Sequence, residues 1–225
     1  MNNDAQKTVA IESSTTRPDS VSTYSEVAVR GQALRSMLSK KNIRIHRDSA
    51  LGVLLRDADS LAKDWEESGA SGKGIQRLLS AAHVNRISEA ILMVGDEPGA
   101  AEALRRIAGS DMDLSGRSLS HGKNALWELD LLSFLRRHSV VAELVDPPDI
   151  VCRFPFGEYA IACKKVYSEK GVEAQMRKGV KQLIPFGGVG LVAFNLDDLA
   201  PERATLMATS NSPTFGQSNS PRQDG

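Results

Sequence analysis

Apolar residues recur every three or four positions through the first half of the chain. From about Glu26 to Asp113 this is the spacing of helices that each bury one face. The predicted helices begin near Val27, Leu51, Ile75, Ser88 and Pro98. The pattern therefore predicts a small helical bundle, and we assign no chemistry to its residues.

After Ser139 the spacing becomes that of strands. The pattern predicts a helix from Asn124 to His138, three strands over residues 140–145, 150–154 and 159–166, a helix from Gly171 to Leu183 and a buried strand over residues 189–194. A tight turn near Pro155 joins the second and third strands. The expected order is α-β-β-β-α-β, with all four strands in one mixed sheet. A short helix is expected over residues 201–208.

Both ends of the chain differ in composition from the rest. Residues 1–25 and 210–225 are rich in small polar side chains, which bury too little apolar surface to offset the entropy of ordering, so both are predicted to be disordered. Between them we expect a helical module over residues 26–113 and an α/β core over residues 114–209. The predicted fold class is α+β.

Composition narrows the protein class. Apolar residues make up 41% and charged residues 25% of the chain, as in a globular protein. No stretch approaches the roughly 18 apolar residues of a membrane span, so we expect a cytoplasmic protein with no membrane partner. Lys and Arg total 28, as do Asp and Glu, so a basic surface would have to be local. Cys152 and Cys163 lie in apolar runs and are expected to be buried, reduced thiols.

Ser71 to Gly74 spell SGKG, part of a phosphate-binding loop pattern. That pattern requires a glycine where Glu67 stands and a Ser or Thr where Gly74 stands. We therefore interpret the segment as a turn between helices.

Three charged residues of the second half are predicted to meet. If Phe156 and Gly157 form the hairpin turn, Asp149 lies opposite Lys164 at the hairpin's open end. Glu128 falls within the apolar stripe of the preceding helix, where a carboxylate is costly unless it is paired or binds a metal. Each residue also has a plainer interpretation: Asp149 as a turn residue, Lys164 as an edge-strand lysine and Glu128 as a glutamate in contact with solvent. Together, two acids and a lysine suit metal-assisted hydrolysis of phosphodiesters.

The letters around these residues resemble a known motif. Pro148-Asp149, a hairpin and then Ile161-Ala162-Cys163-Lys164-Lys165 resemble the PD-(D/E)xK motif of the restriction-endonuclease-like nucleases. The resemblance covers about residues 124–195 and implies that family's α-β-β-β-α-β core. It also implies that Asp149 and Glu128 bind Mg²⁺ or Mn²⁺ and that Lys164 acts on the attacking water. Gln175 loosely matches a residue of the family's second helix that faces the site or the DNA.

One position departs from the motif. The family's second acid would stand two residues before the lysine, where this chain has Ala162. Either Glu128 and Asp149 suffice to bind the metal, or a carboxylate from elsewhere in the chain replaces the missing acid, or the site is inactive. Glu173, on the following helix, is our candidate for a migrated metal ligand.

A local basic surface accompanies the motif. Between Lys164 and Lys181 there are six basic and two acidic residues, a local charge of +4 in a chain whose net charge is zero. This charge favours contact with phosphates, although a helix face in plain contact with solvent has the same composition. The candidate nucleic-acid contacts are Lys165, Gln175, Arg177, Lys178 and Lys181.

These observations lead to an expected function and two rivals. The expected function is magnesium-dependent DNA cleavage, with a homodimer as the usual arrangement for cutting both strands. The first rival is a catalytically degenerate nuclease-fold protein that binds nucleic acid or a protein partner. The second is an interaction protein that works through its helical half.

Overall fold

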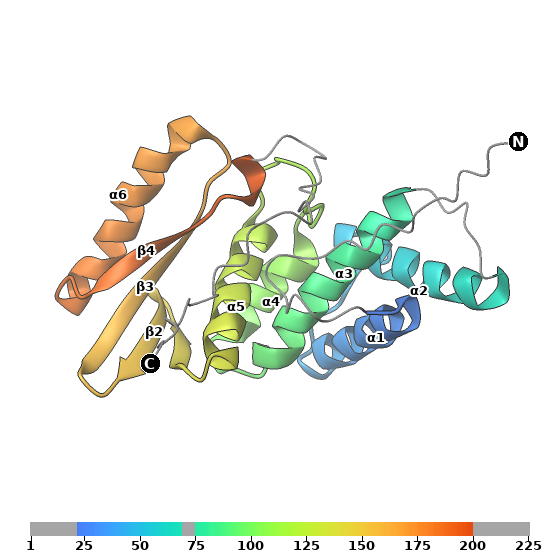
Figure 1. The fold of residues 1–225 in the computed structure, drawn as a ribbon, viewed down its shortest axis with the longest axis horizontal. Coiled ribbons are helices and arrows are strands. Elements are labelled where there is room, and N and C mark those ends of the chain that lie inside the picture. The colour runs from blue at the N-terminus through green and yellow to red at the C-terminus, as the bar shows by residue number, and fades with distance from the viewer. Residues whose placement is uncertain (1–21, 69–74, 200–225) are drawn as a thin grey trace, which may run out of the picture.

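The computed structural model describes residues 22–68 and 75–199, which form a helical bundle beside a four-stranded mixed sheet (Figure 1). The bundle comprises α1 (Tyr24–Lys40), α2 (Ala50–Ser68), α3 (Ile75–Val94) and α4 (Ala100–Gly109). The second half comprises α5 (His121–Arg137), β1 (Val141–Val145), β2 (Asp149–Phe154), β3 (Gly157–Lys165), α6 (Val172–Leu183) and β4 (Gly190–Asn195). The α+β class and the mixed sheet are confirmed.

Two details of the helical half differ from prediction. A capping box starts α1, in which Thr23 Oγ1 accepts from the Glu26 amide at 3.2 Å and Glu26 Oε2 accepts from the Thr23 amide at 2.7 Å. Regular structure thus begins before Ser25, where disorder was expected to end. The two helices predicted near Ile75 and Ser88 form one, α3, because no glycine or proline interrupts that stretch. The SGKG segment, the 201–208 helix and both expected disordered ends up to residue 21 and from residue 210 lie outside the described residues.

The sheet has the strand order β1-β2-β3-β4. The first three strands are antiparallel neighbours, and α6 carries the chain across to β4, which runs parallel to β3. Phe154 pairs with Gly157, so Pro155 and Phe156 form the hairpin turn. The predicted register is therefore wrong by two residues. Because side chains alternate between faces, a shift of two leaves each residue on its predicted face.

The two helices of this half cover opposite faces of the sheet (Figure 1). On the α5 side, Ile150, Cys152, Ile161 and Cys163 join a hydrophobic core that continues through α5 into the helical bundle. The two predicted modules thus share one core. On the α6 side, a smaller cluster forms around Ala162 and Leu183.

Three small residues, one glycine and two cysteines, lie buried between the helices and the sheet. Gly179 lets α6 approach β4 closely, since a Cβ there would lie 2.6 Å from Val192 Cγ1. Cys152 and Cys163 are buried free thiols, and burial raises the pKa of both.

Candidate active site

Asp149 opens strand β2 and is held by three donors. Its Oδ2 accepts hydrogen bonds from the backbone N–H of Cys163 at 2.6 Å and from Nζ of Lys164 at 3.2 Å. Its Oδ1 accepts from Nε2 of Gln182, on α6, at 3.2 Å. The Asp149 and Lys164 side chains are only 10% and 12% exposed. This is a buried, oriented ion pair, in contrast to the flexible pairs of a protein surface.

The backbone at Asp149 is strained. Its φ of +138° is one that side-chain-bearing residues rarely adopt, and such a conformation costs about 1–3 kcal/mol. The three hydrogen bonds to its carboxylate hold it there. Strain kept in place by polar contacts is commonest at functional sites.

The contact between Asp149 and Lys164 is diagonal. The register places Asp149 across from Ala162, so Lys164 is two residues further along β3 on the same face. Long side chains reach each other over this diagonal in a sheet. The predicted contact is present, whereas the predicted direct opposition is wrong because the turn begins one residue earlier than expected.

Glu128, on α5, completes the group. Burial, together with the neighbouring carboxylate of Asp149, raises the pKa of Glu128 to about 7, while Arg106 and Lys164 partly oppose this rise. The charges of Asp149 and Lys164 therefore reach the Glu128 carboxyl group. The fold brings the predicted pair Asp149 and Lys164 into contact from two strands, whereas a metal-binding role for Glu128 stays a prediction.

The electrostatics of the site favour an added cation. Burial also raises the pKa of Asp149, although Lys164 and the Cys163 amide partly oppose this. The ionised forms of both carboxyl groups are thus disfavoured, and Lys164 only partly compensates for this. A divalent cation would supply the missing charge.

The donor set fits a hard cation that keeps part of its hydration. Mg²⁺ is usually bound by one or two carboxylates together with waters and substrate phosphates. Within residues 22–68 and 75–199 no three His, Cys, Asp or Glu side chains gather as a metal-binding group. The carboxylates of this site that could hold such a cation are Asp149 and Glu128. Gln182 Oε1 is buried at the site with no described hydrogen-bond donor, so it can accept from a bound water.

Glu173 does not belong to this group. It lies in the first turn of α6, is 76% exposed, and pairs with Arg177 at 2.5 Å. Gln182 lies nine residues later, or about 13 Å along the helix axis. The prediction of Glu173 as a migrated metal ligand is therefore wrong, because Glu173 occupies the outer face of α6.

Lys165 is also misassigned. Its Nζ bonds Asp198 at 2.8 Å and Asn195 Oδ1 at 2.8 Å, and the Lys165 and Asp198 side chains are 6% and 3% exposed. A lysine committed to a buried pair on the α5 side cannot contact phosphate. The pair instead helps to fix the end of β4.

The other candidate contacts lie on α6. Arg177, Lys178 and Lys181 are exposed, and Gln175 is half-buried. Sequence reasoning missed Gln182, the residue of α6 that touches Asp149. Its signal was helical phase, because Gln175, the buried Gly179 and Gln182 follow at steps of four and three on one face.

Ala162 is fully buried beneath α6 in the cluster with Leu183. The space where the family's second carboxylate would lie is thus filled by apolar packing. Asp197 and Asp198, which follow β4, pair with Arg86 and Lys165 respectively.

Comparison with known proteins gives no family assignment: no protein family matches the chain, and no curated protein or solved structure is significantly similar to it. Across the described parts of the chain, every helix is too short or too polar to cross a membrane.

Proposed function

We propose that this protein is a metal-dependent nuclease of the restriction-endonuclease-like type that hydrolyses phosphodiester bonds of DNA. One observation carries the proposal: a strained, buried Asp149 is bonded to Lys164 beside Glu128, a carboxyl group whose pKa is raised to about 7. Apolar residues would stabilise the end of this sheet better than two buried acids and a lysine. The order α5-β1-β2-β3-α6-β4 supports the same proposal.

Each residue has a distinct role in this proposal. Asp149 and Glu128 hold Mg²⁺ or Mn²⁺, which when bound polarises the phosphate and makes a coordinated water more acidic. Lys164 orients the attacking water and donates a hydrogen bond toward the charge that develops on the phosphate oxygens. The water oxygen bonds to phosphorus as the bond to the leaving oxygen breaks. Gln182 is a positioning residue, since it bonds Asp149 on the oxygen that Lys164 leaves free.

Nucleic acid is the ligand that the surface near this site suits. Arg177, Lys178 and Lys181 project from α6, which covers the same sheet face as Lys164. Exposed cations along a helix bind successive phosphates with little regard to base sequence. Cutting both strands of a duplex would use two copies of the site, and hence a homodimer.

Ala162 favours one alternative, a degenerate nuclease-fold protein that binds nucleic acid or a protein partner without cleaving. The second acid of the PD-(D/E)xK motif is missing, and its place is filled by buried apolar atoms. In that case the Asp149–Lys164 pair persists without metal chemistry.

A cleavage assay separates the two. Supercoiled plasmid and labelled single- and double-stranded oligonucleotides are incubated with Mg²⁺, Mn²⁺ or EDTA. The nuclease predicts products with either metal, none with EDTA, and none from Lys164→Met. Lys63→Ala is the matched control, because Lys63 is 74% exposed on α2 and pairs with the exposed Glu67. DNA binding without metal-dependent cleavage by the wild type would establish the degenerate alternative.

A further inference from the structure

The loop between α1 and α2 carries a strong local charge that the site above does not use. From Arg35 to Arg56 the sequence contains six basic residues and one acid, Asp48, a local charge of +5 in a chain with none overall. Neither the sequence motif nor the carboxylate site involves this segment.

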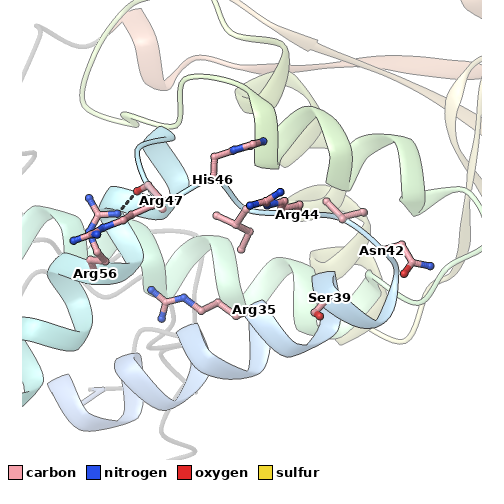
Figure 2. Close-up of a pocket in the computed structure, with 10 residues that line it drawn as sticks. Arg35, Ser39, Asn42, Arg44, His46, Arg47 and Arg56 are labelled. Atoms are coloured by element: carbon pink, nitrogen blue, oxygen red, sulfur yellow. Dashed lines mark hydrogen bonds between the residues drawn. The ribbon is translucent and has the colours of Figure 1, made fainter.

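The loop borders an open pocket of about 590 Å³. Arg35 reaches it from α1, Arg44 and Arg47 from the loop, and Arg56 from α2, with His46 beside them (Figure 2). Among the described residues that line the pocket none is acidic. Four arginines therefore line one pocket, and no acidic residue is among the described residues that line it.

Two of the four guanidinium groups have partners. Arg35 pairs with Asp59 at 2.6 Å, and Arg56 donates to the backbone carbonyl of Arg47. No described residue pairs with the side chains of Arg44 and Arg47, which are exposed. These two are the groups most available to a ligand.

The loop that presents them is tightly built. Ser49 Oγ donates to the carbonyl of His46 at 2.8 Å and accepts from the amide of Gly52 at 3.2 Å. A Cβ on Gly52 would lie 2.3 Å from His46 O, so the loop backbone rests directly on the first turn of α2. Ile43 is buried in the core below. The arginines are thus fixed to the bundle by their backbone, which lowers the entropy lost when a ligand binds.

We propose that this pocket binds phosphate groups of a nucleic-acid backbone. Guanidinium groups donate without accepting, and their planar fork matches two oxygens of one phosphate. The volume lies within the range of ligand pockets and accommodates more than one phosphate group. The choice of nucleic acid over a small phosphate compound rests on the proposed function, whereas the preference for phosphate does not.

A relay of contacts links the loop between α1 and α2 to strand β2, where Asp149 lies. Lys41 pairs with Asp96, in the turn between α3 and α4, at 2.9 Å. Gly99, in the same turn, touches Leu144 of β1, since a Cβ on Gly99 would lie 3.0 Å from Leu144 Cβ. The next residue of β1, Val145, pairs with Asp149. The loop beside the pocket is thus linked, through the α3–α4 turn and β1, to the strand that begins with Asp149.

The test measures DNA binding in EDTA, where cleavage cannot intervene. A fluorescent 20-base-pair duplex is titrated with wild type, R44A/R47A and the control K63A/R105A, which removes the same charge from exposed positions on α2 and α4. R44A/R47A should bind the duplex at least about tenfold more weakly than the wild type. The slope of log affinity against log salt concentration should become shallower by roughly 2, about one unit for each phosphate contact removed. The control should bind like wild type, and equal thermal melting would show that all three are folded.

The proposal would be overturned if R44A/R47A bound DNA with the affinity and salt dependence of the wild type. If, in addition, pyrophosphate raised the melting temperature of the wild type and not of R44A/R47A, the pocket would be assigned to a small phosphate compound. Failure of the proposed function looks different: arginine-dependent DNA binding would persist although no metal supports cleavage.

Discussion

Replacing Glu128 by glutamine should stabilise the metal-free protein. Burial and the proximity of Asp149 raise the Glu128 pKa from 4.5 to about 7. Holding this carboxyl ionised in the folded state therefore costs about 3 kcal/mol at high pH, at about 1.4 kcal/mol for each pH unit. Glutamine keeps the shape and removes the charge, so it recovers part or all of that energy.

The pH dependence gives this prediction its sign. Between pH 4.5 and about 7 the folded protein keeps a proton on Glu128 that the unfolded chain has released. Folding stability from this group is therefore lost as pH rises through that window. Glu128→Gln should change stability little at pH 4.5 and raise it by up to about 3 kcal/mol at pH 8.

Urea unfolding in EDTA measures this difference. Fluorescence and circular dichroism are followed at several pH values between 4.5 and 8, and equal m-values show that both proteins expose the same surface. Glu173→Gln is the matched control, because Glu173 is 76% exposed and should change stability by less than about 1 kcal/mol throughout. If Glu128→Gln is no more stable than wild type at pH 8, Glu128 is not a destabilised buried acid, and its assignment to the site loses its physical basis.

Three further substitutions probe the site. Lys164→Ala should remove cleavage and lower the free energy of unfolding by about 3 kcal/mol near pH 7, because it leaves the Asp149 carboxylate buried without its cation. Chemical denaturation should show a smaller loss of stability at pH 4 than at pH 7. Ala162→Glu should cost about 2–4 kcal/mol, because the position is fully buried, and added Mg²⁺ should restore part of the loss in thermal melts if the new carboxylate reaches the metal. Gln182→Ala should weaken Mg²⁺ affinity about 10- to 100-fold in isothermal titration, and unchanged affinity would show that Gln182 does not position Asp149.

Periodicity in the sequence predicted the order of elements well. The change from helical to strand spacing near Ser139 is found in the structure, where β2 and β3 contain runs of consecutive buried residues because α5 and α6 cover the two faces of the sheet. The hairpin register was wrong by two residues because Pro155, Phe156 and Gly157 can form a turn in more than one way. Parity was preserved, so the contact between Asp149 and Lys164 was still predicted.

The errors concern residues whose surroundings come from distant parts of the chain. Lys165 appeared to be part of a basic surface, but Asn195 and Asp198 bury it from thirty or more residues away. The rotation of α6 could not be fixed from charge alone, so Glu173 was placed inside and Gln182 was overlooked. The arginine pocket escaped notice because its members come from two helices and the loop between them, and only the fold shows that they line one pocket.

The proposed function requires that Asp149 holds a metal ion on which cleavage of DNA depends. The most direct measurement is single-turnover cleavage of a labelled duplex by wild type and Asp149→Asn, with Mg²⁺ and with EDTA. We expect magnesium-dependent products from the wild type and a loss of at least about 100-fold in rate from Asp149→Asn, since a protein ligand of the metal is removed. Equal rates for the two proteins, or products that form equally in EDTA, would contradict the nuclease assignment.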